Sequence, residues 1–168
     1  MDMNFGALVD ESISLELNMA SLYLVFHKLF PEDADFWWTL VLEEKNHAAL
    51  IRSGKDSFMA VDKFPSDLIS ENLQELKDTN GRIALFLKRC EVDPPSREEA
   101  FGLALELERS AGELHFQEFM EKEAGSKIDE IFRQLNKDDK DHEQRIRSYM
   151  ESNGIRLRTG EDGVLFSG

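Results

Sequence analysis

The sequence has a single cysteine, Cys90, among its 168 residues. A disulfide framework is therefore excluded, and so is a zinc or iron–sulfur site built from several cysteines. One thiol fits a reducing compartment, and no Arg- or Lys-led apolar leader opens the sequence, so we expect a cytoplasmic protein. We expect Cys90 itself to be buried and unreactive.

Basic residues are also scarce, because 20 Lys and Arg stand against 34 Asp and Glu and the formal net charge is −14 at pH 7. A nucleic-acid partner requires a basic surface, so this composition predicts none. The most apolar stretch, ISLELNMASLYLVFHKLF, is interrupted by Glu16, His27 and Lys28 and does not predict a membrane span. The surplus of acidic residues leaves room for carboxylates that bind a cation.

Helical periodicity dominates the sequence, and no stretch alternates as a strand does. We expect the long helices at about 5–30, 33–53, 97–123 and 127–151, and two shorter ones at about 66–77 and 81–90. Pro31, Gly54 and the DPPS sequence separate these stretches, and Ser96 with Glu99 predicts a capping box for the third long helix.

This arrangement predicts an all-α fold with one domain over residues 1–152 and a C-terminal tail over 153–168. The domain consists of two helical hairpins, at 5–53 and 97–151, joined by a helical connection over 55–95. We therefore expect a four-helix bundle with a long crossover between its second and third long helices.

An internal repeat relates the second and fourth long helices. WWTLVLEEKNHAALIRS at 37–53 aligns with FRQLNKDDKDHEQRIRS at 132–148. The matched polar residues are Glu44 with Asp139 and His47 with His142. Two carboxylate-x-x-His sequences within a repeat are a stronger signal than one.

The first and third long helices are related in the same way. LELNMASLY at 15–23 aligns with LERSAGELH at 107–115. The matched residues are Glu16 with Glu108 and Tyr23 with His115. We therefore interpret the domain as two related helical hairpins.

Each long helix carries a carboxylate within its apolar stripe, where Leu, Ile, Phe, Trp and Ala recur three and four residues apart. A buried carboxylate is costly unless it is paired or neutralised, and carboxylates that converge repel one another. Lys and Arg do not occur midway along the stripes. Divalent cations would therefore supply the balancing charge.

Residues three apart share a helical face, so a carboxylate-x-x-His pair can reach one metal ion together. We predict a site for two metal ions, expected to be iron, with manganese or zinc as alternatives. The predicted ligands are Glu16, Glu44, His47, Glu108, Asp139 and His142.

Several neighbours of these ligands have open or minor roles. Asp138 and Asp141 are alternatives to Asp139, whereas Glu106 lies nearly opposite the stripe and is expected to face solvent. Glu43 is expected to be only a flanking charge. Tyr23 and His115 are expected to pack in the core, or to orient ligands from outside the metal shell, and His115 is also an alternative direct ligand.

The sequence resembles the short rubrerythrin-like members of the ferritin-like superfamily over about residues 5–150. The resemblance rests on Glu16, Ala20 and Tyr23, on EEKNH at 43–47, on Glu108 and on DDKDH at 138–142. It implies a ferritin-like four-helix bundle, assembly into dimers or larger oligomers, and chemistry with O2 or peroxide at a di-iron centre. The apolar character of 5–30 all round its helix also predicts a homodimer.

Three features depart from the family pattern. Asp139 stands where the family has glutamate, and Ala111 stands where peroxide-reducing members have a further glutamate. The paired Cys-x-x-Cys sequences of a rubredoxin-type domain are absent, so electrons would come from an external donor protein.

The alternative interpretation is a ferritin-like dimeric scaffold with a degraded metal site that acts as an interaction or regulatory module. Asp139 and Ala111 favour it. A third interpretation is zinc hydrolysis at a mononuclear site.

Overall fold

The computed structural model describes residues 3–109, 119, 121, 125–135 and 142–157. These residues form helices, turns and irregular connections without a strand, which agrees with the predicted all-α class. The α-helices are α1 (Met3–Leu29), α2 (Ala34–Phe58), α3 (Leu73–Cys90), α4 (Arg97–Leu107), α6 (Lys127–Leu135) and α7 (His142–Ser152). The short 3-10 helices are η1 (Pro31–Asp33), η2 (Met59–Val61) and η3 (Ser66–Leu68).

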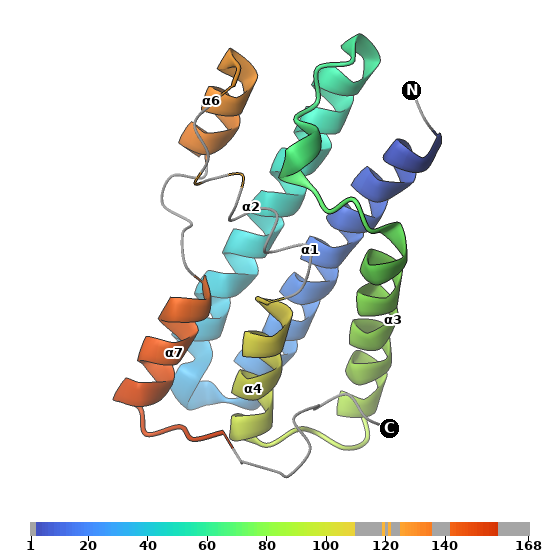
Figure 1. Ribbon diagram of the computed structural model, residues 1–168. Coiled ribbons are helices and arrows are strands. Elements are labelled where there is room, and N and C mark those ends of the chain that lie inside the picture. The colour runs from blue at the N-terminus through green and yellow to red at the C-terminus, as the bar shows by residue number, and fades with distance from the viewer. Residues whose placement is uncertain (1–2, 110–118, 120, 122–124, 136–141, 158–168) are drawn as a thin grey trace.

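Helices α1 and α2 form a long antiparallel pair joined by η1, and α3 lies along α1 (Figure 1). Phe26 of α1 meets Phe86 of α3 edge-on, with ring centroids 6.4 Å apart. The Asn18 side chain donates a hydrogen bond to Asn80 at 2.9 Å. Leu15 and Leu22 lie on this same face of α1 and are buried within the chain. Helix α3 thus covers only part of the second apolar face of α1, because Leu17 stays 37% exposed, and the homodimer stays a prediction.

At one end of the molecule, the buried carboxylate of Asp33 in η1 accepts hydrogen bonds from two other segments. Arg97, the first residue of α4, donates to both of its oxygens at 2.6 and 2.7 Å. Tyr149 of α7 donates to Oδ1 at 2.9 Å. These hydrogen bonds therefore connect η1, α4 and α7, which meet at the lower end of the view in Figure 1.

At the opposite end, α6 approaches α2 at Gly54. A Cβ atom at Gly54 would lie 2.5 Å from Cζ of Phe132, and the Phe132 ring also packs near Phe58 and Phe64. Real Cβ atoms do not come this close to a ring carbon. The absent side chain therefore allows the aromatic ring to seat on α2.

Two predicted boundaries in the first half are wrong. Helix α2 continues past Gly54 to Phe58, because this glycine accommodates Phe132 and does not end the helix. The two short helices expected at 66–77 and 81–90 are replaced by η3 and a single α3 that runs through Gly81. Burial of Leu76, Ile83 and Phe86 on one face of α3 outweighs the low helix propensity of glycine.

In the second half, the capping box is confirmed, since the Ser96 hydroxyl accepts from the Glu99 amide and Glu99 accepts from the Ser96 amide. The uninterrupted helix expected through Glu108 is wrong, because α4 ends at Leu107 and the amide of Arg109 bonds to the Glu106 carbonyl three residues back. A tertiary hydrogen bond to the Glu108 side chain accompanies this tightened turn.

The single helix predicted over 127–151 corresponds to two described helices, α6 over Lys127–Leu135 and α7 over His142–Ser152. Residues 136–141 between them lie outside the described part, so the continuity of that helix stays a prediction. Gly154 has a φ of 66°, and Ile155 donates to the Met150 carbonyl at 2.9 Å. Gly154 is therefore the expected C-terminal cap. Cys90 is buried as predicted, and burial raises the pKa of its thiol.

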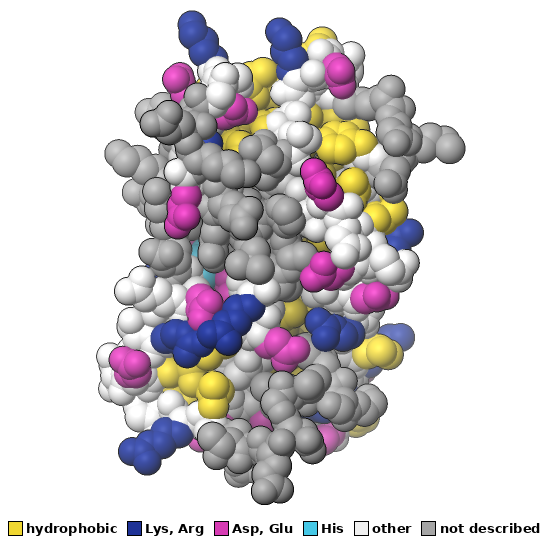
Figure 2. Space-filling model, in the orientation of Figure 1, with side chains coloured by type: hydrophobic (Ala, Val, Ile, Leu, Met, Phe, Trp, Pro, Cys, Tyr) yellow, Lys and Arg dark blue, Asp and Glu magenta, His cyan; other side chains and the backbone are white. Residues whose placement is uncertain are grey.

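None of the helices in the described residues combines the length and the apolar character that a bilayer crossing requires. On the face shown in Figure 2, Lys and Arg side chains are interspersed with Asp and Glu. Over α4 and α7 the pairing is direct, because Glu143 contacts both Arg109 and Arg147.

Candidate metal centre

Five of the predicted ligands are buried in the middle of the molecule. Glu16 comes from α1, Glu44 and His47 from α2, Glu108 from the turn after α4, and His142 from the first described residue of α7. Each is at most 3% exposed. The apolar stripes that flank them explain this burial, because a helix that buries its stripe also buries the polar residues within it.

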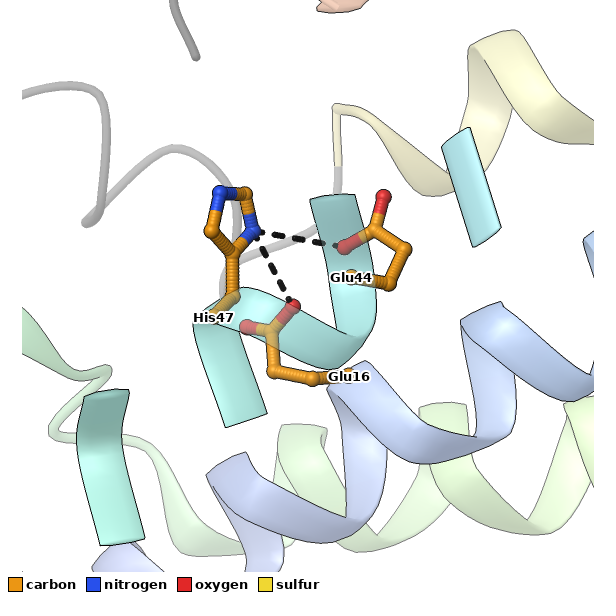
Figure 3. Close-up of side chains that lie close together, drawn as sticks. All are labelled: Glu16, Glu44 and His47. Carbon is orange, nitrogen blue, oxygen red and sulfur yellow. Dashed lines mark ion pairs between the residues drawn. The ribbon is translucent and has the colours of Figure 1, made fainter. Parts of the chain in front are cut away.

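The first group, which we name the α1–α2 cluster, consists of Glu16, Glu44 and His47 (Figure 3). Nδ1 of His47 lies 3.5 Å from Oε2 of Glu16 and 3.4 Å from Oε2 of Glu44. Three ligand atoms, one from each residue, lie within 4.8 Å of one another. The spacing of three residues in α2 places Glu44 and His47 on one face, as predicted.

The second group, the α2–α7 cluster, consists of Glu44, Glu108 and His142. Nδ1 of His142 lies 3.4 Å from Oε1 of Glu44 and 3.3 Å from Oε2 of Glu108. Glu44 therefore belongs to both clusters, with one carboxylate oxygen facing each. The rings of His47 and His142 are nearly parallel, with centroids 5.4 Å apart.

Tyr23 fixes one oxygen of Glu108. Its hydroxyl donates a hydrogen bond of 2.8 Å to Oε1 of Glu108, which leaves Oε2 directed toward His142. The Tyr23 ring is fully buried beside Trp37, with centroids 5.7 Å apart. Tyr23 thus both packs in the core and orients a predicted ligand.

Several oxygens of these carboxylates lack a hydrogen bond within the described residues. They are Oε2 of Glu16, both oxygens of Glu44 and Oε2 of Glu108. Their distances to the imidazoles exceed ordinary hydrogen-bond lengths, and a buried carboxylate oxygen without a partner is costly. Carboxylate oxygen and imidazole nitrogen are donors that first-row divalent metals accept. Each cluster could therefore hold a metal ion.

The pKa values show how protons balance the charges in the metal-free protein. Burial raises the pKa of Glu16 to about 7, and the charge of Glu44 adds to this effect. Burial also acts to raise the pKa of Glu44, but contacts with His142 and His47 outweigh it and hold that pKa below its ordinary value. Burial opposes the charge on His142, yet Glu108 and Glu44 raise its pKa well above the ordinary value. Metal binding would therefore displace protons from this site.

The remaining predicted residues have different outcomes. Asp139 and His115 lie outside the described residues, as do Asp138, Asp141 and Ala111, so their roles stay predictions. Glu106 is partly exposed and lies 3.8 Å from Arg82, on the outer side as expected.

Glu43 is not the flanking charge that we expected. Its side chain is only 13% exposed, it accepts two hydrogen bonds from Arg145, and its Oε2 lies 3.4 Å from Nε2 of His142. The internal repeat contains a signal for this contact, because Arg145 occupies the position that matches the apolar Leu50. A long arginine side chain at that position can extend its charged end to a neighbouring carboxylate or to water.

The described residues thus bring together two buried Glu/His groups that share one glutamate. Their donor atoms are suited to cations, and the surrounding stripes keep them from solvent. Comparison with protein-family models, with characterised proteins and with solved structures finds no match for this chain, so its function is inferred from these residues.

Proposed function

We propose that this protein is a rubrerythrin-like di-iron protein, an oxidoreductase that acts on O2 or peroxide or oxidises ferrous iron, with electrons from an external donor. One observation carries the proposal: the two buried clusters share Glu44, with one oxygen of this residue facing each imidazole. A shared carboxylate suits two neighbouring ions and not one isolated ion.

The proposal includes a ferritin-like four-helix bundle within a single domain over residues 1–152. Its four segments would be α1, α2, α4 with the turn at Glu108, and α7. In support, α1, α2, the turn after α4 and α7 each contribute a buried residue to the clusters. We also propose that the protein functions as a homodimer.

The chain's own residues would hold the ions as follows. Glu16 and His47 would bind one ion and Glu108 and His142 the other, with Glu44 between them. Bound iron would supply the electrons that reduce O2 or peroxide. Tyr23 would keep Oε1 of Glu108 engaged, so that Oε2 is the oxygen available to the ion.

Charge balance is compatible with the same assignment. Glu16, Glu44 and Glu108 are three buried carboxylates, and the predicted ligand Asp139 would make four. Four negative charges match two divalent cations, whereas a single cation would leave protons on Glu16 or His142 to balance the rest. Charge balance thus permits a dinuclear site, and the shared Glu44 is the feature that favours it over the mononuclear zinc alternative.

The test is to load metal-free protein anaerobically with ferrous iron, measure iron per chain, and then admit O2. We expect about two iron ions per chain and, after oxidation, the absorption band of oxo-bridged ferric iron. One tightly bound zinc with no redox-dependent spectrum would favour the hydrolase instead. Less than about half a metal ion per chain would overturn the proposal and favour the scaffold interpretation.

A further inference from the structure

The two ring nitrogens of His142 face different partners. Nδ1 is directed at Glu44 and Glu108, the carboxylates of the α2–α7 cluster. Nε2 lies 3.4 Å from Oε2 of Glu43, which is outside both clusters. An imidazole that binds a metal through one nitrogen carries a proton on the other, and the partner of that proton sets the tautomer and the ring orientation.

Glu43 is itself held in a fixed orientation by Arg145. One guanidinium nitrogen of Arg145 donates to Oε1 at 2.8 Å and a second donates to Oε2 at 2.5 Å. A two-pronged contact of this kind fixes the plane of the carboxylate as well as its position. The side chains of Glu43 and Arg145 are 13% and 34% exposed, so solvent screens the contact only in part.

The pair also connects the two helices that carry ligands of the α2–α7 cluster. Glu43 immediately precedes Glu44 in α2, and Arg145 lies one turn after His142 in α7. A contact between them therefore limits how far α7 can rotate or slide relative to α2. Such movement would carry Nδ1 of His142 away from Glu44.

We propose that Glu43 and Arg145 are positioning residues for His142. Arg145 holds the Glu43 carboxylate, Glu43 accepts a hydrogen bond from Nε2–H of His142, and Nδ1 is thereby presented to the ion of the α2–α7 cluster. The separation of 3.4 Å is slightly longer than an ordinary hydrogen bond, and contacts of this type often shorten when the ligand binds. The inference rests on the proposed metal site, because Nδ1 of His142 acts as a ligand only if an ion is bound there.

Helix α7 supplies a matched control in Glu143. This residue is the immediate neighbour of His142, and its carboxylate accepts hydrogen bonds from Arg109 and from Arg147. It therefore resembles Glu43 in charge, helix contact and arginine pairing. Glu143 is not part of either cluster.

The experiment measures Co²⁺ affinity by the visible absorption of the bound ion. It uses two parent variants, each of which retains the ligands of only one cluster. His47→Ala keeps the α2–α7 cluster, and His142→Ala keeps the α1–α2 cluster. We expect Glu43→Gln to weaken Co²⁺ binding about 10- to 100-fold in the His47→Ala background and to leave it unchanged in the His142→Ala background. Glu143→Gln should change neither.

A second variant separates positioning from general stability. Arg145→Lys keeps the positive charge but loses the two-pronged contact, so its Co²⁺ affinity should fall between those of the parent and Arg145→Gln. Circular dichroism checks that each variant is folded, and the lysine variant provides the test if Glu43→Gln is not.

The outcomes distinguish the two levels of the argument. If Glu43→Gln has the same effect in both backgrounds, or no effect in either, the positioning role is wrong while the metal site stands. If the unsubstituted protein binds no Co²⁺, the proposed metal site is wrong and this inference with it.

Discussion

The α1–α2 cluster and the α2–α7 cluster use similar residues but are assembled differently. Glu16, Glu44 and His47 all lie within two long helices that are adjacent in sequence and pack along their length. Glu108 lies in a turn just after α4, and His142 is the first described residue of α7. The first cluster therefore follows from one helical hairpin, whereas the second depends on packing between distant segments.

This difference explains where supporting contacts occur. In the α2–α7 cluster, Tyr23 bonds to Glu108, and the pair formed by Glu43 and Arg145 faces His142. Glu108 lies at the end of α4, and a residue at a helix end has fewer backbone restraints than one in the middle of a helix. The hydrogen bond from Tyr23 restores the orientation that the turn does not provide.

The largest effect should come from the residue that the clusters share. Glu44→Ala removes a ligand from both, so we expect bound iron to fall from about two ions per chain to nearly none. His47→Ala and His142→Ala should each lose about one ion. Metal analysis after anaerobic loading measures this, with exposed Asn46→Ala as the control on the same helix. Loss of only one ion in Glu44→Ala would show that the clusters are independent.

The next effect concerns pH and belongs to the α1–α2 cluster. The pKa of Glu16 is raised from 4.5 to about 7, so its contribution to the stability of metal-free protein is complete below about pH 4.5 and is lost as pH rises through 7. The shift corresponds to about 3 kcal/mol. Urea unfolding between pH 5 and 8 should show this loss.

Glu16→Gln is the control for that prediction, because an amide stays neutral throughout this range. The difference in unfolding free energy between the parent and Glu16→Gln should grow with pH. Equal pH profiles for the two proteins would show that Glu16 is not the group responsible.

A smaller effect should follow from Tyr23→Phe, which removes the hydrogen bond to Glu108 but keeps the buried ring. We expect Co²⁺ affinity of the α2–α7 cluster to fall about tenfold, since an unrestrained Glu108 must be ordered when the ion binds. The α1–α2 cluster should be unaffected. Titration of the His47→Ala and His142→Ala proteins, each with and without this change, measures the contrast.

The smallest effect is expected at Gly54, where the second half of the chain contacts α2. An added methyl group would press on the Phe132 ring, while alanine favours the helix by about 1 kcal/mol, so we expect a net loss of stability of only about 1 kcal/mol. Thermal unfolding measures it, with exposed Gly81→Ala, which meets no neighbouring atom, as the control. A stability gain at Gly54 equal to that at Gly81 would contradict the close contact.

The sequence was sufficient to predict the helical class and the burial of Glu16, Glu44, His47, Glu108 and His142, because these residues interrupt apolar stripes with regular spacing. Periodicity did not locate the end of α4 at Leu107, where the Glu108 side chain makes a tertiary hydrogen bond with Tyr23. It also assigned Glu43 to the surface, because the contact with Arg145 joins residues that are 102 positions apart. Pairings at such separations follow from how the helices pack and not from the pattern within one helix.

Glu44 has a further consequence if each cluster binds an ion, as we propose. One carboxylate that contacts both ions makes the two binding events thermodynamically linked, so occupancy of either cluster changes the affinity of the other by the same factor. The favoured sign depends on whether ordering Glu44 outweighs repulsion between the cations. Protein with one ion bound would then be rare if binding is positively cooperative and abundant if it is negatively cooperative. The measured fraction of singly loaded protein would therefore show the sign of the coupling through Glu44.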